Sequence, residues 1–156
     1  MTFVASIDGD NYAGVSVLAA DRENICYVSN RGDDPVSLAP GIYGLSNASL
    51  DAPWSKLLRS KEALATLIDR DTVNSTELFR ILSDRTPAAS AEIVTNDLPF
   101  TLARALTAPF IVADDYGTRC STTLLYANDG RVEFSERRFA ADGTASGDSN
   151  FSFESA

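Results

Sequence analysis

The sequence predicts an α+β protein in which antiparallel sheet layers combine with helices, as a single domain over residues 1–156. Three observations support this class. Short β-rich runs gather near both ends of the chain, two amphipathic helical segments lie between them, and no internal repeat is present. Strands followed by helices and again by strands are typical of α+β proteins. A length of 156 residues with 44% hydrophobic composition suffices for one domain with its own core.

The first β-rich region predicts a hairpin. Residues 15–20 and 25–29 are apolar runs joined by the polar residues 21–24. The stretch that follows, residues 27–54, is dense in glycine and proline, which restrict or extend the backbone angles available to the chain. Such a stretch indicates either a shaped site or a structural crossing. Within it, residues 43–47 resemble a strand that ends at Ser46 and Asn47.

Two helices are predicted next. Asp51 suits an N-cap and Pro53 suits a first helical turn. Apolar residues at helical spacing then extend over residues 54–69. A second helix is expected to begin near Ser75 and to end near Arg85, whose positive charge favours a helix C-terminus.

The remaining chain predicts a variable region and then more strands. Residues 86–109 contain three prolines and many small residues, which predicts a loop with a short helix at 101–106. The runs 121–126 and 132–139 flank Asn128–Gly130, and Asp-Gly between β-rich runs is a strong hairpin signal.

The C-terminal end predicts a flexible polar segment over 142–150 and an edge strand at 151–153. Some predicted strands carry apolar residues on both faces, whereas the helices can cover only one face of a sheet. We therefore expect a layer to be missing from this chain. The residues that indicate it are Tyr27, Val28, Leu124 and Leu125.

Composition excludes several classes of function. The chain has 13 Lys and Arg against 22 Asp and Glu, a formal charge of -9, which disfavours nucleic acid as a partner. No apolar run approaches the roughly 20 residues of a membrane span, and no basic leader precedes an apolar segment, so we expect a cytoplasmic protein. Because histidine is absent, a His-based triad, the common zinc sites and His-ligated haem are excluded. We expect no metal and no cofactor.

Cys26 and Cys120 form no metal-ligand pattern, and their surroundings predict two buried thiols.

The first candidate ligand-binding residues are Asn30 and Arg31, which follow a predicted strand directly. Arg31 has the geometry to bind a carboxylate in bidentate fashion, but the same residues suit a turn closed by Gly32, and the turn is favoured. Ser46 and Asn47 are the second pair. The Asn47 amide can donate into an oxyanion hole, or it can form a simple Asx-turn.

Three further candidates lie later in the chain. Trp54 offers a large recognition surface at the end of the glycine-rich stretch. Tyr116 and Arg119 precede a strand, where the guanidinium is suited to a substrate carboxylate. The alternative is that Arg119 pairs with acidic neighbours such as Asp114 and Asp115.

The same segments resemble the transport-and-Golgi-organisation (NRDE) family. The likeness follows the chain in order and covers most of it outside residues 86–109. It comprises Tyr12-Ala13-Gly14 with VSVLAAD, then ICYVSNRG, LAPGIYGLSNASLDAPWSKL, YGTRCSTTLLY and VEFSERRF. Family members begin with Met-Cys and carry an NRDE block and a Gly-Gly-Thr-Trp segment, none of which is in this sequence. The resemblance therefore implies the C-terminal part of such a domain.

The resemblance also implies a fold and a set of functions. Related proteins look like N-terminal-nucleophile hydrolases, four-layer αββα sandwiches in which an N-terminal thiol attacks an amide. By analogy with the bile-salt hydrolase and penicillin V acylase group, Asn47 would stabilise the oxyanion and Arg119 would orient the nucleophile's surroundings. Without the nucleophile, we expect this chain not to catalyse alone.

Three functions remain open. In the first, the chain binds a small acyl, lipid or haem-like ligand, or completes a partner chain or a homodimer. In the second, it is part of an amidase that is active only with its N-terminal portion. In the third, it is a structural or trafficking module with no small-molecule site.

Overall fold

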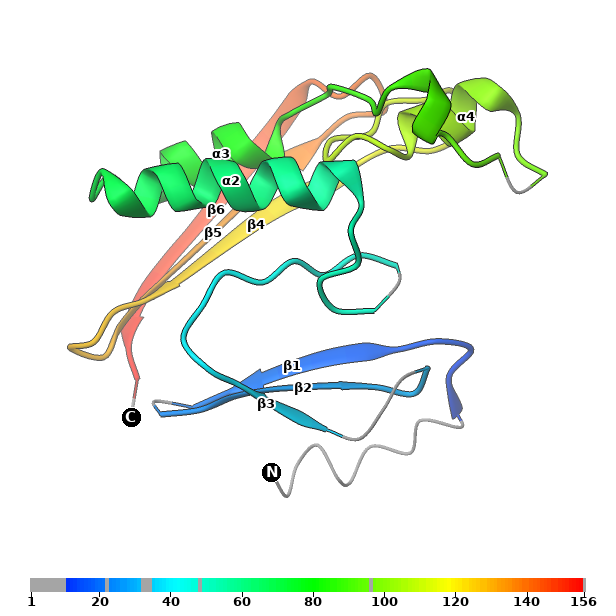
Figure 1. The fold of residues 1–156 in the computed structure, drawn as a ribbon. Coiled ribbons are helices and arrows are strands. Elements are labelled where there is room, and N and C mark those ends of the chain that lie inside the picture. Colours follow the sequence, from blue (N-terminus) through cyan, green and yellow to red (C-terminus); the bar gives the residue numbers. More distant parts are fainter. Residues whose placement is uncertain (1–10, 22, 32–34, 48, 96, 156) are drawn as a thin grey trace. The chain divides into compact units, whose positions relative to one another are not determined.

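The computed structural model describes residues 11–21, 23–31, 35–47, 49–95 and 97–155. The chain divides into two compact units, Met1–Ala52 and Pro53–Ala156, and each is described by itself (Figure 1). The expectation of one domain stays a prediction. Gly32, which was expected to close a turn, lies outside the described residues.

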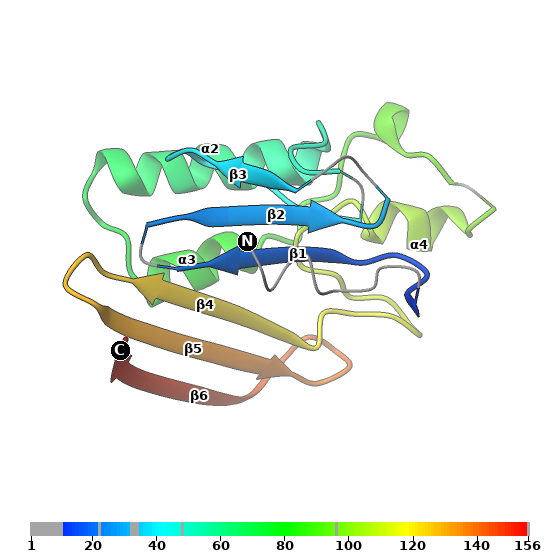
Figure 2. The same cartoon turned by 90° about the horizontal axis from the view of Figure 1, so that it is seen from below.

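The first unit contains a three-stranded antiparallel sheet. Its strands are β1 (Ser16–Ala20), β2 (Ile25–Ser29) and β3 (Val36–Leu38), in the order β1-β2-β3 (Figure 2). The predicted hairpin is confirmed, with Ser16 opposite Ser29 and Ala20 opposite Ile25. The third strand was not predicted, because three residues between proline-containing turns carry too little periodic signal.

The hairpin link is held by the Asp21 side chain. Its carboxylate accepts hydrogen bonds from the backbone N–H groups of Glu23 and Asn24, at 2.9 and 2.7 Å. These bonds favour the ionised carboxylate, so they lower the pKa of Asp21 below its usual value. The polar residues thus form the turn that the sequence predicts.

Two predictions near the end of this unit are wrong. Residues 43–47 do not form a strand. Asp51 is not a helix cap: its φ of 57° is left-handed, and its carboxylate accepts a 2.7 Å hydrogen bond from the Gly44 N–H. A second 2.7 Å bond runs from the Asp51 N–H to the Gly44 carbonyl. Asp51 therefore closes a loop by bonding to Gly44. This contact joins residues seven positions apart, so a local capping pattern does not reveal it.

The second unit begins with the helices. They are α2 (Ser55–Asp69), α3 (Ser75–Leu82), the 3₁₀ turn η2 (Ser90–Glu92) and α4 (Phe100–Ala105). The two long predicted helices and the short one are confirmed, but α3 ends at Leu82 rather than near Arg85. The side chain of Asn74 caps α3 by accepting a 3.0 Å hydrogen bond from the Glu77 N–H. Trp54, not Asp51, is the N-cap residue of α2 and makes no side-chain cap.

The second sheet contains longer strands. They are β4 (Cys120–Tyr126), β5 (Arg131–Phe139) and β6 (Ala145–Glu154), antiparallel in the order β4-β5-β6. The hairpin between β4 and β5 is confirmed, and Gly130 has the positive φ of 91° that its tight turn requires. The edge strand at 151–153 is also confirmed.

The prediction of a flexible segment at 142–150 is wrong, because β6 begins at Ala145. Its polar residues pair across the sheet. The Arg137 guanidinium donates two hydrogen bonds to the Asp148 carboxylate, at 3.0 and 2.8 Å. A polar strand is stable here because its cross-strand partners on β5 are also polar or charged.

Helix α3 covers one face of this sheet (Figure 1). The Thr123 hydroxyl lies 3.2 Å from that of Ser75, and the Arg137 guanidinium lies 4.9 Å from the centre of the Phe79 ring. The core continues beyond the helix, where Phe110 and Phe139 meet edge to face with ring centres 4.7 Å apart. Phe110 is only 2% exposed. This cluster gives the second unit a core of its own.

The opposite face of the sheet is open. Strand alternation places four large exposed apolar side chains on it, namely Leu124, Tyr126, Phe151 and Phe153. Cys120 lies on the same face and is exposed, so the prediction of two buried thiols holds for Cys26 and is wrong for Cys120. The two cysteines are not joined in a disulfide.

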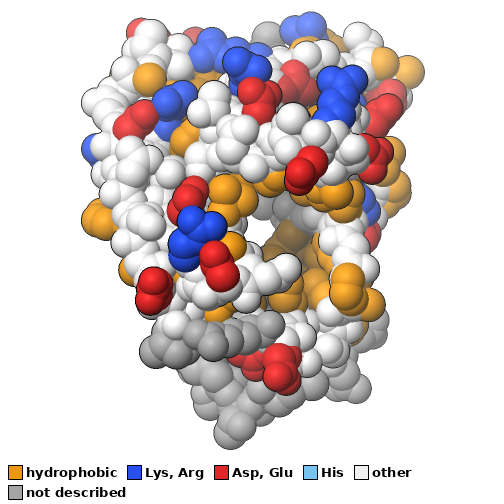
Figure 3. Space-filling view, turned by 90° about the vertical axis from the view of Figure 1, so that its left-hand side faces the viewer, with side chains coloured by type: hydrophobic (Ala, Val, Ile, Leu, Met, Phe, Trp, Pro, Cys, Tyr) orange, Lys and Arg blue, Asp and Glu red, His pale blue; other side chains and the backbone are white. Residues whose placement is uncertain are grey.

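The architecture is α+β with two small antiparallel sheets, as the sequence predicts. Membership of an αββα sandwich stays a prediction. Within the described part of the chain, no helix combines the length and apolar character needed to cross a membrane. On the side drawn in Figure 3, Lys and Arg side chains are interspersed with Asp and Glu and do not form one basic patch.

Candidate functional site

The predicted site residues fall into both units. The first unit holds Asn30, Arg31, Ser46 and Asn47, and the second holds Trp54, Tyr116 and Arg119. The roles that the family resemblance implies for Asn47 and Arg119 therefore stay predictions.

Asn30 and Arg31 hold the segment that leads into β1. The Asn30 side chain accepts a 2.8 Å hydrogen bond from the Val15 N–H and donates one of 2.9 Å to the Tyr12 carbonyl. The Arg31 guanidinium donates two hydrogen bonds to the Ala13 carbonyl, at 3.2 and 2.9 Å. These contacts tie residues 12–15 to the end of β2, which favours the structural interpretation of the pair over ligand binding.

Arg31 also explains the glycine in the Tyr12-Ala13-Gly14 motif. A Cβ atom built on Gly14 would lie 2.3 Å from the Arg31 Nε atom. Any side chain at position 14 would therefore displace the guanidinium from its bonds to Ala13. The motif and the arginine form one packing unit.

Ser46 and Asn47 retain the capacity to bind a ligand. Ser46 is half-buried and Asn47 is exposed. Neither side chain makes a hydrogen bond to any residue that the structure describes. Among the described residues, the donor and acceptor groups of the Asn47 amide therefore have no partner.

Trp54 is 46% exposed and lies beside a cation. The Lys56 ammonium is 5.8 Å from the centre of the indole ring and donates a 3.0 Å hydrogen bond to the Leu106 carbonyl. Burial lowers the pKa of Lys56, because it disfavours the charged ammonium. Trp54 thus combines an exposed aromatic surface with a positive neighbour on α2.

Tyr116 and Arg119 lie on the approach to β4. Tyr116 is 54% exposed, and its carbonyl accepts a 2.9 Å hydrogen bond from the Ala113 N–H. The Arg119 carbonyl accepts one of 2.9 Å from the Phe139 N–H. The exposed Arg119 guanidinium makes no ion pair within the described ranges, so the expected alternative of pairing with Asp114 or Asp115 is not observed.

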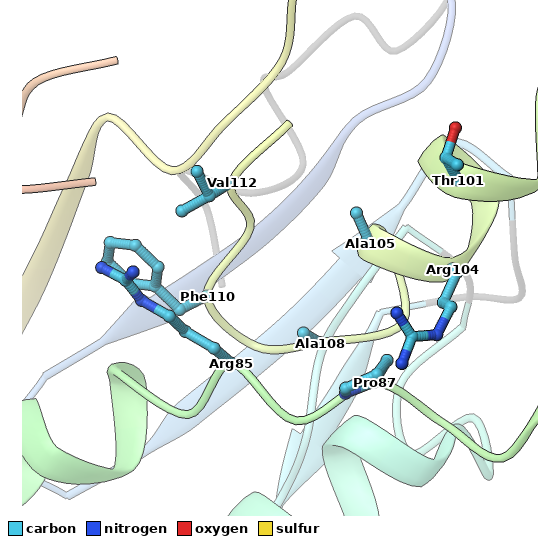
Figure 4. A pocket seen from close by; sticks show the side chains of 8 residues that line it. All are labelled: Arg85, Pro87, Thr101, Arg104, Ala105, Ala108, Phe110 and Val112. Atoms are coloured by element: carbon cyan, nitrogen blue, oxygen red, sulfur yellow. The ribbon is translucent and has the colours of Figure 1, made fainter. Parts of the chain in front are cut away.

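A cavity of about 280 Å³ lies within the second unit, largely in the region where the sequence predicted a variable loop with a short helix. It is bounded by the segment after α3, by α4 and by the segment before β4 (Figure 4). Two arginines, one threonine and five apolar residues line it: Arg85, Pro87, Thr101, Arg104, Ala105, Ala108, Phe110 and Val112. No pattern in the sequence indicates it, because the lining residues come from three separate segments.

Arg85 is fixed in place on one wall. Its guanidinium lies 4.8 Å from the centre of the Phe110 ring and donates a 2.8 Å hydrogen bond to the Gly143 carbonyl. Gly143 has a φ of +76°, and a Cβ there would lie 2.7 Å from the Val112 Cγ2 atom. A glycine is therefore required for this wall to close.

Arg104 is the second cation of the cavity. Its side chain extends from α4 toward Pro87 and Ala108 (Figure 4). Its guanidinium makes no hydrogen bond or ion pair with a residue in the described ranges. The backbone nearby is well fixed, because the Thr107 hydroxyl donates to the Arg104 carbonyl at 2.6 Å and accepts from the Ala88 N–H at 2.8 Å.

No group of three or more histidine, cysteine, aspartate or glutamate side chains suited to a metal ion occurs among the residues described.

The fold and cavity define an α+β protein with a candidate small-ligand site, and the comparisons with known proteins define its family. The family model described as Transport and Golgi organisation 2 matches residues 2–141. The chain belongs to this family.

Curated relatives agree with the match. A Transport and Golgi organization protein 2 homolog from Bos taurus is 36% identical over 147 residues, which cover 85% of this chain and 53% of the relative. The Homo sapiens homolog is 34% identical over 146 residues, covering 85% and 53%. The Mus musculus homolog is 30% identical over 159 residues, covering 93% and 58%. The chain thus spans little more than half the length of these relatives.

Proposed function

We propose that this chain is the C-terminal part of a Transport and Golgi organisation family domain that does not catalyse on its own. It binds a small acyl, lipid or haem-like ligand and is completed by further polypeptide of the same family. We also propose that it acts in the cytoplasm.

The observation that supports this proposal is that both sheets have an open apolar face. In the second unit, Leu124 and Phe151 are each 61% exposed and share one face with Tyr126 and Phe153. In the first unit, register places Leu18, Ile25 and Val36 on one face, with 53, 47 and 46% exposed. Contiguous exposed apolar side chains on a sheet mark an interaction surface.

The open faces favour added polypeptide as the occupant. The family relatives contain about as much chain outside the matched region as within it. Burying apolar side chains on a second layer contributes about 25 cal/mol per Å² of area removed from water. A second copy of this chain is the other polypeptide that could cover the faces, and its binding is an outcome of the test below.

The test mixes this chain with the unmatched portion of the Bos taurus relative and measures complex formation by sedimentation velocity. We expect a one-to-one complex. The double variant Leu124→Ser and Phe151→Ser should weaken it by at least about tenfold, because two anchoring side chains are lost. Leu58→Ser is the matched control, since Leu58 is 54% exposed on α2. Absence of a complex, or equal weakening by the control, contradicts the proposal. A dimer of this chain alone would identify a second copy as the occupant.

An amidase formed with the N-terminal portion is the alternative function. The observation in its favour is that the Asn47 amide and the Arg119 guanidinium have no hydrogen-bond partner in the described ranges. An oxyanion donor typically contributes about 10²–10³-fold to turnover. In the mixed complex, Asn47→Ala should then abolish most amide hydrolysis, whereas Arg70→Gln, which alters another exposed arginine, should not. No hydrolysis by the intact complex rules the alternative out.

A further inference from the structure

The cavity beside α4 has the composition of a small-anion site in an otherwise acidic chain. Two of the eight lining residues are arginines and none is acidic, although the chain carries a net charge of -9. The other contributors are one hydroxyl, from Thr101, and apolar side chains. A concave apolar surface with a few convergent polar groups is the usual form of a small-molecule site.

The two arginines have different roles there. Arg85 is already engaged by the Phe110 ring and the Gly143 carbonyl, so it stabilises the wall and adds positive potential. The Arg104 guanidinium makes no bond to a described residue, and it extends from α4 toward Pro87 (Figure 4). A guanidinium presents paired N–H donors that match a carboxylate in bidentate geometry. Arg104 is therefore the group that can bind the anion.

The walls and the volume define the rest of the ligand. Ala105, Ala108, Phe110 and Val112 offer an apolar surface that a bare inorganic anion would leave unused. A volume of about 280 Å³ corresponds to roughly nine water-sized volumes of ~30 Å³, so the ligand has on the order of ten non-hydrogen atoms.

We infer that this cavity binds a small carboxylate with a short apolar body, with Arg104 pairing with the carboxylate. The inference deepens the ligand-binding part of the proposed function and rests on it. It concerns the second unit alone, so it is tested without any added polypeptide. If the chain forms no complex with added polypeptide, the carboxylate-binding result still stands. If the cavity binds no carboxylate, the proposal that further polypeptide covers the sheets still stands.

The experiment titrates the full chain with hexanoate, hexanamide and inorganic phosphate, following backbone amide shifts of α4 and residues 108–112 by NMR. Hexanoate should shift these amides, and hexanamide, which has nearly the same shape without charge, should bind much more weakly. Arg104→Gln should weaken hexanoate binding by about tenfold or more, the loss expected for one charge-assisted hydrogen-bonded pair. Arg70→Gln, an exposed arginine at the C-cap of α2, should leave it unchanged.

Cavity filling provides an independent variant. Ala105→Leu places a larger apolar side chain in the cavity and should reduce hexanoate affinity while keeping both arginines. The inference is overturned if hexanoate does not bind, if Arg104→Gln binds it as well as the unmodified chain, or if hexanamide binds equally. Phosphate binding as tight as hexanoate also overturns it, because the apolar body would then contribute nothing.

Discussion

The two sheets differ in how far the chain itself buries them. Strands β4, β5 and β6 contain seven, nine and ten residues, and α3 covers one of their faces. Strands β1, β2 and β3 contain five, five and three residues, and among them only Cys26 is buried. The second unit has an aromatic core, whereas the described residues of the first are held mainly by backbone pairing and by the bonds of Asn30 and Arg31.

This difference indicates that the two units lose stability for different reasons. Substituting a core residue of the second unit should lower its stability through lost packing. Substituting a polar residue of the first unit should lower its stability through lost hydrogen bonds. Each of the two sheets still has an apolar face of its own that this chain leaves exposed. The following predictions test the comparison, from the largest expected effect to the smallest.

The largest effect is expected from Phe110→Ala. This side chain is 2% exposed and contacts Phe139 and Arg85. Its removal should lower the free energy of unfolding by about 3–5 kcal/mol, as for other buried aromatic residues. Urea denaturation followed by far-UV circular dichroism measures this. Phe100→Ala is the control, because Phe100 is 51% exposed on α4, and a similar loss in both variants would contradict a core centred on Phe110.

Gly143→Ala should come next. The positive φ and the closeness of Val112 and Phe110 both oppose a Cβ at this position. We expect a loss of about 1–3 kcal/mol in the free energy of unfolding. At Gly147 the nearest atom to a built Cβ is the end of the Arg138 side chain, at 2.9 Å, which can move. Gly147→Ala should therefore cost clearly less, and the reverse order would contradict the described wall.

Asn30→Ala should destabilise the first unit selectively. It removes the hydrogen bonds to Val15 and Tyr12, each worth about 1 kcal/mol. Hydrogen exchange should accelerate in β1 and β2, with little change in β4–β6. Asn47→Ala is the control, since the Asn47 side chain makes no described hydrogen bond. Equal acceleration of hydrogen exchange in both sheets would contradict the prediction that Asn30 stabilises the first unit selectively.

The smallest effect concerns Asp84. Burial raises the pKa of the Asp84 carboxyl, but hydrogen bonds from Thr86 and from the Arg59 guanidinium lower it by a larger amount, so the net pKa lies below its usual value. A lowered folded-state pKa stabilises the protein above the unfolded value of about 3.9 and loses that contribution as pH falls through the folded value. Asp84→Asn should therefore cost about 0.5 kcal/mol at neutral pH, reduced by solvent screening. The difference from the unmodified chain should shrink as the pH falls through the folded-state pKa of Asp84, as urea midpoints measured across pH would show; a constant difference would contradict this assignment.

The features predicted correctly are those encoded locally. The β1–β2 hairpin, helices α2 and α3, and the Asp-Gly turn each depend on neighbours within a few residues. Asp51 was misassigned because its partner is Gly44, seven residues away. The N-terminal half of β6 was missed because its polar residues are stable as a strand only opposite β5. The cavity was missed for the same reason, since Arg85 and Arg104 come to line one pocket only after folding.

Thiol labelling tests most directly whether the β4–β6 face is open until further polypeptide covers it. Cys120 lies exposed on that face, whereas Cys26 is buried in the first unit. Mass spectrometry of the native chain with a maleimide should show Cys120 modified faster than Cys26. Adding the unmatched portion of the Bos taurus relative should then slow modification of Cys120. Cys120 labelling that is slow in the chain alone, or unchanged in a formed complex, would contradict the account.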